Sequence, residues 1–504
     1  MKQEFIAAVQ SSYPDDKAHL FLGCGVLQGE IHADARVNIP LSMMNRHGLI
    51  AGATGSGKTR TLQVLAEQLS KAGVPVFLSD IKGDLSGLGI PGVRNAKIEE
   101  RATALNFGFE SAAVPVELYS LSGKLGAQMR ATVMEFGPIL LAKVLELNET
   151  QTGVLSILFK YADDKGLPIV DLQDLKKVLN YLSDGPGKAE IKESYGIISS
   201  ATSGTILRKI VALEQQGVGG IFGEPSFEIN DLMGKVDGQG VVSLLNVSDM
   251  QDKPAVFSTF LLSLLAELYQ SLPEAGDLDK PKLVFFLDEA HLLFNDAPKA
   301  FLEQVEQIVR LIRSKGVGVF FCTQMAQDIP QTVLAQLGNR FQHVLRAFTP
   351  NDAKALKDTV KTYPRSAFYE IDETLTQMGI GQALITVLNS KGIPTEVVQT
   401  HLVPPSAVMG PMPQNEYIAH LEQSELYRKY AEAIDPVSAY EILNQRIQQQ
   451  SSDAPVSSTA PTKSGKKEKT MLEEVMNSSV TRSIGREIVR GIFGMIFGGS
   501  RRRR

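Results

Sequence analysis

Cysteine is scarce in this sequence, in which Cys24 and Cys322 are the only two among 504 residues. Two cysteines supply neither a disulfide framework nor a zinc cluster, so we expect neither to hold the fold. Cys322 ends an apolar run and is expected to pack there as a small buried side chain. This usage is typical of a protein in a reducing compartment.

Long apolar runs are also missing. None reaches the roughly 18 residues that a membrane-spanning helix requires. The first residues, Met1 to Ile6, lack a stretch apolar enough for a signal peptide, so we expect a cytoplasmic protein. Hydrophobic types make up 43% of the chain, which suffices for a large core and predicts one to three domains.

Excess positive charge is absent as well, since the formal net charge is −5. This balance argues against a protein that binds nucleic acid over its whole surface. It does not argue against a local basic lining, because a ring-shaped motor grips a polymer backbone through a few residues of its pore.

A glycine-rich segment lies between the apolar run Leu49 to Ala51 and a helix-like segment that extends to about Lys71. It has the complete pattern of a phosphate-binding loop, in which glycines let backbone N–H groups point at phosphates. Lys58 is expected to reach the β- and γ-phosphates, and Thr59 to hold Mg²⁺. The residues expected to bind the nucleotide are Gly52, Ala53, Thr54, Gly55, Ser56, Gly57, Lys58, Thr59 and Arg60.

A second apolar run, Leu283 to Leu287, is typical of a strand buried on both faces, and it ends in Asp288 and Glu289. Asp288 is expected to contact the metal, and Glu289 to polarise the attacking water as general base. The second carboxylate favours hydrolysis over phosphoryl transfer to another acceptor. The alternative is that the pair caps a helix that begins near Ala290.

A third buried run, Val317 to Cys322, follows a helix-like segment, 304–315, that carries Arg310 and Arg313. It stops at Gln324, whose amide is well placed to sense a γ-phosphate or, alternatively, to satisfy a turn. Residues 338–341 and 343–346 then predict a loop followed by a strand.

In combination, these segments resemble the HerA-like branch of the HerA/FtsK ATPases, and most closely a bacterial group of HerA-like ATPases. The resemblance extends from about residue 20 to residue 405. The motifs that carry it are Asn45 to Thr59, Leu78 to Asp84, Leu287 to His291, Cys322 to Gln324 and Leu345 to Pro350.

The resemblance implies an α/β fold with a RecA-like, ASCE-type P-loop NTPase core and a mostly parallel sheet. It implies ATP and Mg²⁺ as cofactors, and a homo-hexameric ring with nucleotide between neighbouring subunits. Arg46, twelve residues before Lys58, and Arg313 match family arginines, and one of them would complete the neighbouring subunit's site. Asp80 also matches the family, although a turn-forming role is nearly as well supported by its surroundings.

The expected organisation has five parts. Residues 1–47 form a short β-rich lead, where HerA proteins carry a larger N-terminal barrel. Residues 48–405 form the core, with a helical insertion at about 85–235 that includes helix-like stretches such as 127–146. A helical extension (406–447), a flexible linker (448–470) and a basic amphipathic tail (471–504) follow.

The C-terminal segment is electrostatically distinct. Residues 463–504 contain eleven Lys or Arg and four Glu, a net charge of +7. Apolar residues at helical spacing in 480–497 predict a basic amphipathic helix that binds an anionic membrane surface or a protein partner. The alternative is a helix that packs on the core. Attachment to the periphery of the inner membrane is therefore a second expectation for location.

We expect an ATPase that works as a HerA/FtsK-type ring motor, with double-stranded DNA as the polymer and helicase-like or translocase activity. The alternatives are a nucleotide-gated assembly protein, and a coupling ATPase of secretion or conjugation that acts on protein partners or at the membrane surface.

Overall fold

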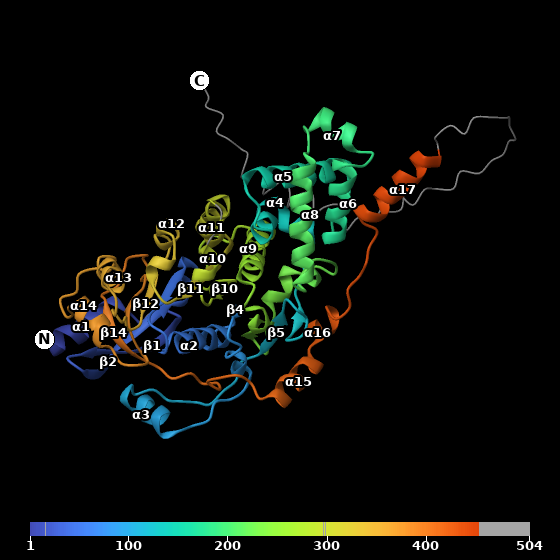
Figure 1. The fold of residues 1–504 in the computed structure, drawn as a ribbon. Helices are drawn as coiled ribbons and strands as arrows, with labels where there is room; N and C mark the ends of the chain where they lie inside the picture. The colour runs from blue at the N-terminus through green and yellow to red at the C-terminus, as the bar shows by residue number, and fades with distance from the viewer. Residues whose placement is uncertain (16, 296, 298, 453–504) are drawn as a thin grey trace, which may run out of the picture. The chain divides into compact units, whose positions relative to one another are not determined.

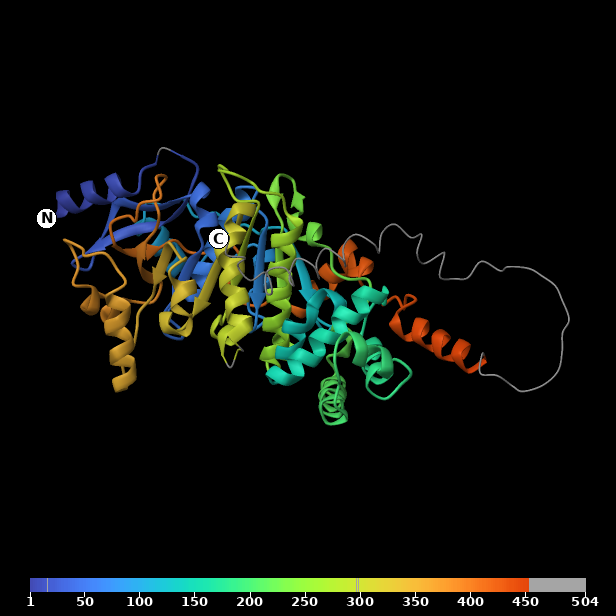
Figure 2. The ribbon, with the colours of Figure 1, turned by 90° about the horizontal axis from the view of Figure 1, so that it is seen from above.

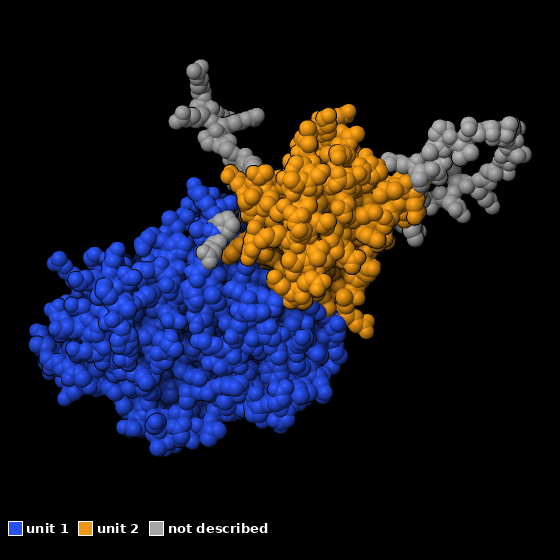
Figure 3. Space-filling view, viewed as in Figure 1, with its two compact units in different colours: residues 1–128, 228–258, 264–431 blue, residues 129–227, 259–263, 432–504 orange. Residues whose placement is uncertain are grey.

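The computed structural model describes residues 1–15, 17–295, 297 and 299–452. The described chain forms two compact units (Figures 1 and 3). Unit 1 comprises Met1–Gln128, Glu228–Ser258 and Leu264–Ala431. Unit 2 comprises Met129–Phe227, Thr259–Ser263 and the described residues from Glu432 on.

Unit 1 is built on one sheet, in which the described residues supply twelve strands in the order β2-β1-β14-β13-β12-β3-β11-β10-β4-β9-β5-β6. The strands lie side by side in the view from above (Figure 2). Their bounds are β1 His19–Leu27, β2 Glu30–Pro40, β3 Gly48–Ala51, β4 Val76–Asp80, β5 Val116–Ser120, β6 Ala127–Gln128, β9 Val242–Asn246, β10 Leu283–Leu287, β11 Val317–Thr323, β12 Asn339–Gln342, β13 Gln382–Thr386 and β14 Val398–Leu402.

The sheet changes character at β12. From β12 to β6, every neighbouring pair of strands is parallel, whereas the pairs from β12 to β2 are antiparallel. The parallel strands β10 and β11 are buried along their whole length, as expected for continuous apolar runs covered on both faces. The expectation of a mostly parallel α/β sheet is therefore confirmed.

Helices cover this sheet. Those within unit 1 are α1 Lys2–Ser12, α2 Lys58–Lys71, α3 Ala96–Ala104, α10 His291–Phe294, α11 Lys299–Ile312, α12 Gln331–Leu334, α13 Pro350–Val360, α14 Ile371–Gln377, α15 Gln414–Gln423 and α16 Glu425–Lys429. Helix α9, Pro254–Ser271, supplies residues to both units.

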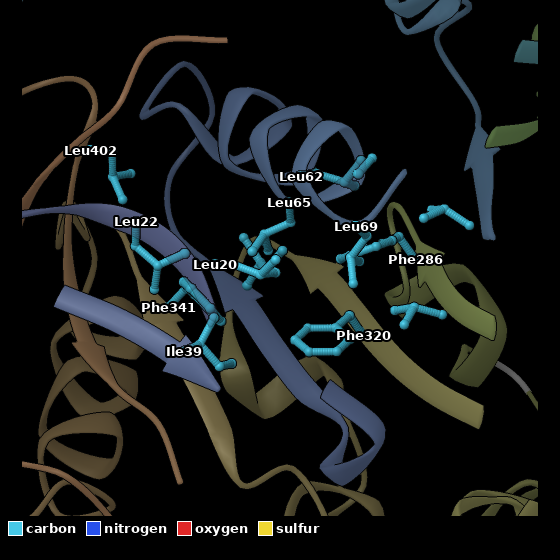
Figure 4. Close-up of a cluster of buried hydrophobic side chains, with 14 of the residues drawn as sticks. Leu20, Leu22, Ile39, Leu62, Leu65, Leu69, Phe286, Phe320, Phe341 and Leu402 are labelled. Atoms are coloured by element: carbon cyan, nitrogen blue, oxygen red, sulfur yellow. The ribbon is translucent and has the colours of Figure 1, made fainter. Parts of the chain in front are cut away.

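Helix α2 is fixed by its apolar face. Leu62, Leu65 and Leu69 recur at helical spacing and lie in one buried cluster with Phe286 of β10 and Phe320 of β11 (Figure 4). Each buried leucine contributes roughly 1.5–3 kcal/mol relative to an exposed one, so this face holds the first turn of α2 firmly against the strands.

Unit 2 is helical. It contains α4 Val133–Val144, α5 Glu149–Lys165, α6 Leu172–Ser183, α7 Lys188–Ser194, α8 Ser200–Gln215 and α17 Ala439–Ser452. None of the helices in the described ranges is long and apolar enough to cross a membrane.

The structure differs from the expected boundaries of the insertion. Its first part, to Gln128, belongs to unit 1, because β5 pairs with β9 and β6 pairs with β5. The helix expected over 127–146 begins only at Val133, and Gly137, before Pro138, departs from helical geometry.

Two further segments differ from expectation, and the N-terminal lead contains two strands together with a helix. The strand expected at 343–346 lies at Asn339–Gln342, where the sequence predicts a loop, because these residues pair with β3 and β13. The N-terminal lead begins with helix α1, and its strands β1 and β2 extend the same sheet. Helix α17 continues to Ser452, into the expected linker. The tail, 471–504, lies outside the described residues.

Candidate nucleotide site

The phosphate-binding loop connects β3 to α2, and its backbone path requires glycine at two positions. Gly52 has φ 151°, and a Cβ there would lie 2.5 Å from Cβ of His343. Gly57 has φ 114° at the N-cap of α2, and a Cβ there would lie 3.3 Å from the backbone nitrogen of Gly381. The N–H of Gly52 donates to the carbonyl of Gln324 at 3.2 Å, which joins the loop to the end of β11.

The ammonium group of Lys58, which is predicted to bind phosphate, lies on this loop. Nζ of Lys58 donates to the carbonyl oxygens of Gly52 at 2.6 Å and Ala53 at 3.2 Å. Thr59 and Arg60 follow in the first turn of α2, both half-buried, and Nη1 of Arg60 donates to Oε1 of Gln63 at 2.9 Å. The ammonium therefore bends back onto the carbonyl oxygens of its own loop.

The predicted acidic pair lies at the carboxyl end of β10. Asp288 is buried, and its N–H donates to Oγ of Ser79 at 3.0 Å. Its Oδ1 accepts the N–H of Glu289 at 2.9 Å. Burial, and then the Glu289 charge, raise the pKa of Asp288. A buried carboxylate of this kind is stabilised by a cation, so Asp288 suits a magnesium ligand.

The strand register brings the loop and the acids together. Strand β11 pairs in parallel with β3 on one side and with β10 on the other. Thr323 lies opposite Ala51, and Phe321 lies opposite Leu287, so the loop, Gln324 and Asp288 leave the same edge of the sheet. One strand inserted between the loop strand and the acidic strand is the order of an ASCE-type, RecA-like P-loop NTPase core.

The residues at this edge fit a nucleoside triphosphate with Mg²⁺. They comprise a glycine loop at a helix N-terminus, an ammonium, the hydroxyl-bearing Thr59 and a buried carboxylate. The side chain of Gln324 is exposed beside the loop. Thr54 and Gly55 are also exposed, whereas Ser56 is buried.

Lys82 is a residue of this site that the sequence did not single out. Its Nζ lies 2.8 Å from Oε1 of Glu289, and this carboxylate raises the pKa of Lys82. The lysine belongs to the loop after β4, whose turn is held by Asp80. The signal in the sequence was the segment from Asp80 to Asp84, but nothing in it indicates which acid Lys82 reaches.

Asp80 forms a turn. Its Oδ1 accepts the N–H groups of Gly83 at 2.8 Å and Asp84 at 3.2 Å, and its Oδ2 accepts the N–H of Leu85 at 2.9 Å. Burial raises the pKa of Asp80 to about 6. With both oxygens occupied by its own loop, Asp80 acts here as the turn-forming residue that was the alternative interpretation of its sequence.

His343 is the second residue that sequence reasoning missed. It directly follows β12, and its N–H donates to the carbonyl of Ala51 at 2.7 Å. Nε2 lies 2.9 Å from Oγ1 of Thr61 on α2. Burial, and then the charge of Lys58, lower the pKa of His343 to about 4. A neutral imidazole therefore lies beneath the phosphate loop.

Arg46 and Arg313 are not brought to this edge. Arg46 precedes β3 and Arg313 precedes β11, so both lie at the amino ends of strands whose carboxyl ends carry the site. Burial, and then the Arg46 charge, lower the pKa of Arg313, so the two guanidinium groups lie near each other. The seven residues of β11, at about 3.3 Å each, place the two edges roughly 20 Å apart.

Comparison with known proteins identifies relatives of this chain. The family model for the helicase HerA-like C-terminal region matches residues 26–503. The DNA double-strand break repair helicase HerA of Sulfurisphaera tokodaii is 23% identical over 363 residues, 70% of this chain and 65% of the relative. The corresponding protein of Sulfolobus acidocaldarius is 20% identical over 362 residues. The chain thus spans about 65% of the length of these curated relatives.

Solved structures with a similar course of the chain include the bacterial conjugative coupling protein TrwB. It is 14% identical, with a TM-score of 0.49 over 80% of this chain and 94% of its own. VirB4 of Thermoanaerobacter pseudethanolicus is also 14% identical, with a TM-score of 0.49 over 78% of this chain and 98% of its own. Because the family model covers most of the sequence, this chain belongs to the helicase HerA-like C-terminal family.

Proposed function

We propose that this protein hydrolyses ATP and couples the hydrolysis to movement along double-stranded DNA. The observation that carries the ATPase proposal is the common edge of β3, β11 and β10, from which the phosphate loop, Gln324 and the Asp288–Glu289 pair all emerge. A site that only binds a nucleotide would need no more than the loop. Glu289, the second carboxylate, supplies the base that hydrolysis also requires.

Each residue has a distinct role in this proposal. The loop amides and Lys58 hold the phosphates, and Thr59 and Asp288 hold Mg²⁺, which would neutralise charge on the phosphate oxygens. Glu289 accepts a proton from the attacking water. Gln324, next to the loop, senses the terminal phosphate and communicates its loss to β11.

The arginines support an assembly in which sites are shared. Since Arg46 and Arg313 lie at the opposite edge of the sheet from the phosphate loop of their own chain, they serve a site only if it belongs to a neighbour. A head-to-tail ring satisfies this requirement for every subunit at once, and we propose a homo-hexamer. An arginine supplied in this way accelerates phosphoryl transfer by on the order of 10³-fold or more.

DNA is supported as the polymer by the curated relatives, which are named as DNA double-strand break repair helicases. Protein translocation and nucleotide-gated assembly are the other outcomes that a direct test of the polymer distinguishes.

The test is steady-state ATP hydrolysis by the full chain, wild type beside Glu289→Gln, without and with double-stranded DNA at two salt concentrations. We expect Glu289→Gln to bind ATP and to lose about 10²- to 10⁴-fold in hydrolysis. Glu30→Gln is the matched control, because Glu30 is exposed at the start of the edge strand β2.

Stimulation by DNA that weakens as salt rises would support the DNA motor. A hydrolysis rate that depends on Glu289 but does not change with DNA would support the ATPase proposal and favour a protein partner over DNA. Near-normal turnover of Glu289→Gln would remove the ATPase mechanism itself.

A further inference from the structure

Glu289 and Lys82 form an ion pair across two loops. Nζ of Lys82 lies 2.8 Å from Oε1 of Glu289, although the residues are 207 positions apart in the chain. The Glu289 side chain is only 11% exposed, whereas that of Lys82 is 50% exposed. The acid is thus fixed inside the edge of the sheet, and the lysine reaches it from the solvent side.

The loop that carries Lys82 is built to hold this position. Asp80 closes it with three accepted backbone hydrogen bonds, and Gly83 supports the turn with φ 74°. Asp84 and Asp288 also lie close enough to act on the Lys82 charge. The ammonium therefore stays near this acidic edge, while its four-carbon stem leaves it free to change partner.

The carboxylate of Glu289 is largely withdrawn from solvent in this conformation, since its side chain is 11% exposed. Oε1 accepts the Lys82 hydrogen bond, and Oε2 is buried without a hydrogen-bond partner among the described residues, 3.5 Å from Nδ1 of His291. The backbone of Glu289 has φ 46°, in the left-handed region that a residue with a side chain rarely occupies. The surrounding contacts hold the acid in this orientation.

We propose that Lys82 is a positioning residue that keeps Glu289 in a resting orientation until the terminal phosphate of a bound nucleoside triphosphate draws the ammonium away. Release of Lys82 then frees the Glu289 carboxylate to accept a proton from water. The inference rests on the proposed role of Glu289 as general base. It adds a condition to that role: hydrolysis begins only when the terminal phosphate competes with Glu289 for Lys82.

The test compares the full-length wild type with Lys82→Met, Lys82→Arg and the double variant Lys82→Met/Glu289→Gln in ATP hydrolysis without DNA. An ion pair of this exposure is worth up to about 1 kcal/mol, so Lys82→Met should raise kcat about 2- to 5-fold with little change in KM. Lys82→Arg restores a cation and the low resting rate. The double variant shows no rise, because the released base is gone. Lys97→Met, on the exposed side of α3, removes the same charge elsewhere.

Three results would overturn the inference: a fall in kcat of Lys82→Met, which makes the lysine part of the productive state; a rise in KM alone, which makes it a phosphate ligand; and no change. Far-ultraviolet circular dichroism establishes that each variant is folded. Wild-type hydrolysis that does not depend on Glu289 would instead overturn the proposed ATPase, and this inference with it, so the two failures are distinguishable.

Discussion

Nε2 of His343 lies 2.9 Å from Oγ1 of Thr61, joining the end of β12 to the first turns of α2 across 282 residues of sequence. The imidazole is buried directly under the phosphate loop, where the Lys58 ammonium also acts on it. A protonated imidazole at this position would place two positive charges together in a buried region. The loop is therefore supported by a histidine that must stay neutral.

This arrangement predicts a pH dependence of stability. The pKa of His343 is about 4 in the folded protein, below its ordinary value of 6.5, so the unfolded chain binds the proton more readily. Its stabilising contribution is complete above pH 6.5 and is lost as pH falls toward 4. Between pH 7.5 and 5, the loss from this histidine is on the order of 2 kcal/mol.

Urea unfolding followed by far-ultraviolet circular dichroism at pH 7.5 and pH 5 measures this loss. His343→Asn should be less stable at pH 7.5 but should lose less stability on acidification than the wild type. Equal pH dependence of wild type and His343→Asn would show that this histidine is not held neutral.

Gly52 leads to a second prediction. A Cβ at this position would lie 2.5 Å from Cβ of His343 and adopt φ 151°, so Gly52→Ala has both a clash and backbone strain. We expect at least about a tenfold loss of ATP affinity, measured with a fluorescent nucleotide, because the loop must shift to relieve the clash. Gly29→Ala is the matched control, since Gly29 has φ 84° and open space around its Cβ position. Unchanged affinity in Gly52→Ala would contradict the fit of this loop to phosphate.

The fold could be predicted from sequence wherever a local pattern sufficed. Strand β10 lies where its continuous apolar run placed it, and α2 follows its phosphate loop to Lys71. Strand β12 was placed four residues too late, because Asn339 to Gln342 carry no strand-like alternation. Their strand conformation comes from pairing on both sides with β3 and β13, which a local pattern does not contain.

The site divides in the same way. The phosphate loop with Lys58 is one contiguous motif, and the acidic pair is another. The chemistry of both could therefore be predicted from the sequence without their positions in space. Lys82 and His343 act through contacts that span more than 200 residues, and these contacts exist only once the sheet order brings the strand ends together. The positions of Arg46 and Arg313 at the opposite edge likewise required the strand directions.

The charge of the C-terminal segment predicts binding to anionic surfaces. Residues 463–504 have a net charge of +7, which leaves −12 for the rest of the chain, so the segment is attracted to acidic lipid while the remainder is not. We expect the full chain to sediment with vesicles that contain anionic lipid, and a chain lacking 471–504 to stay in the supernatant. Replacing Arg501 to Arg504 with serine tests charge separately from the apolar pattern. Equal sedimentation of the full and shortened chains would contradict this role.

The position of Arg46 and Arg313 at the edge opposite the phosphate loop yields a prediction about rings assembled from two variants. Arg46→Ala leaves a subunit with an intact phosphate loop, and Lys58→Ala leaves one with an intact Arg46. Each variant alone should be nearly inactive in ATP hydrolysis. In rings assembled from equal amounts of the two variants, an interface is active only when Arg46→Ala supplies the phosphate loop and Lys58→Ala supplies the arginine. This arrangement occurs at about one interface in four, so about a quarter of the wild-type rate should return.

The comparison needs a measure of assembly and a control arginine. Light scattering should give the same particle mass for each variant and for the mixture. Arg310 is exposed on α11, and Arg310→Ala should hydrolyse ATP by itself, with no second variant added. If the mixture stays inactive while its mass is that of the wild type, Arg46 does not act across the interface, and Arg313, its neighbour at the same edge, becomes the residue to exchange in the same design. If Arg46→Ala alone retains full activity, neither its own site nor a neighbour's depends on this guanidinium.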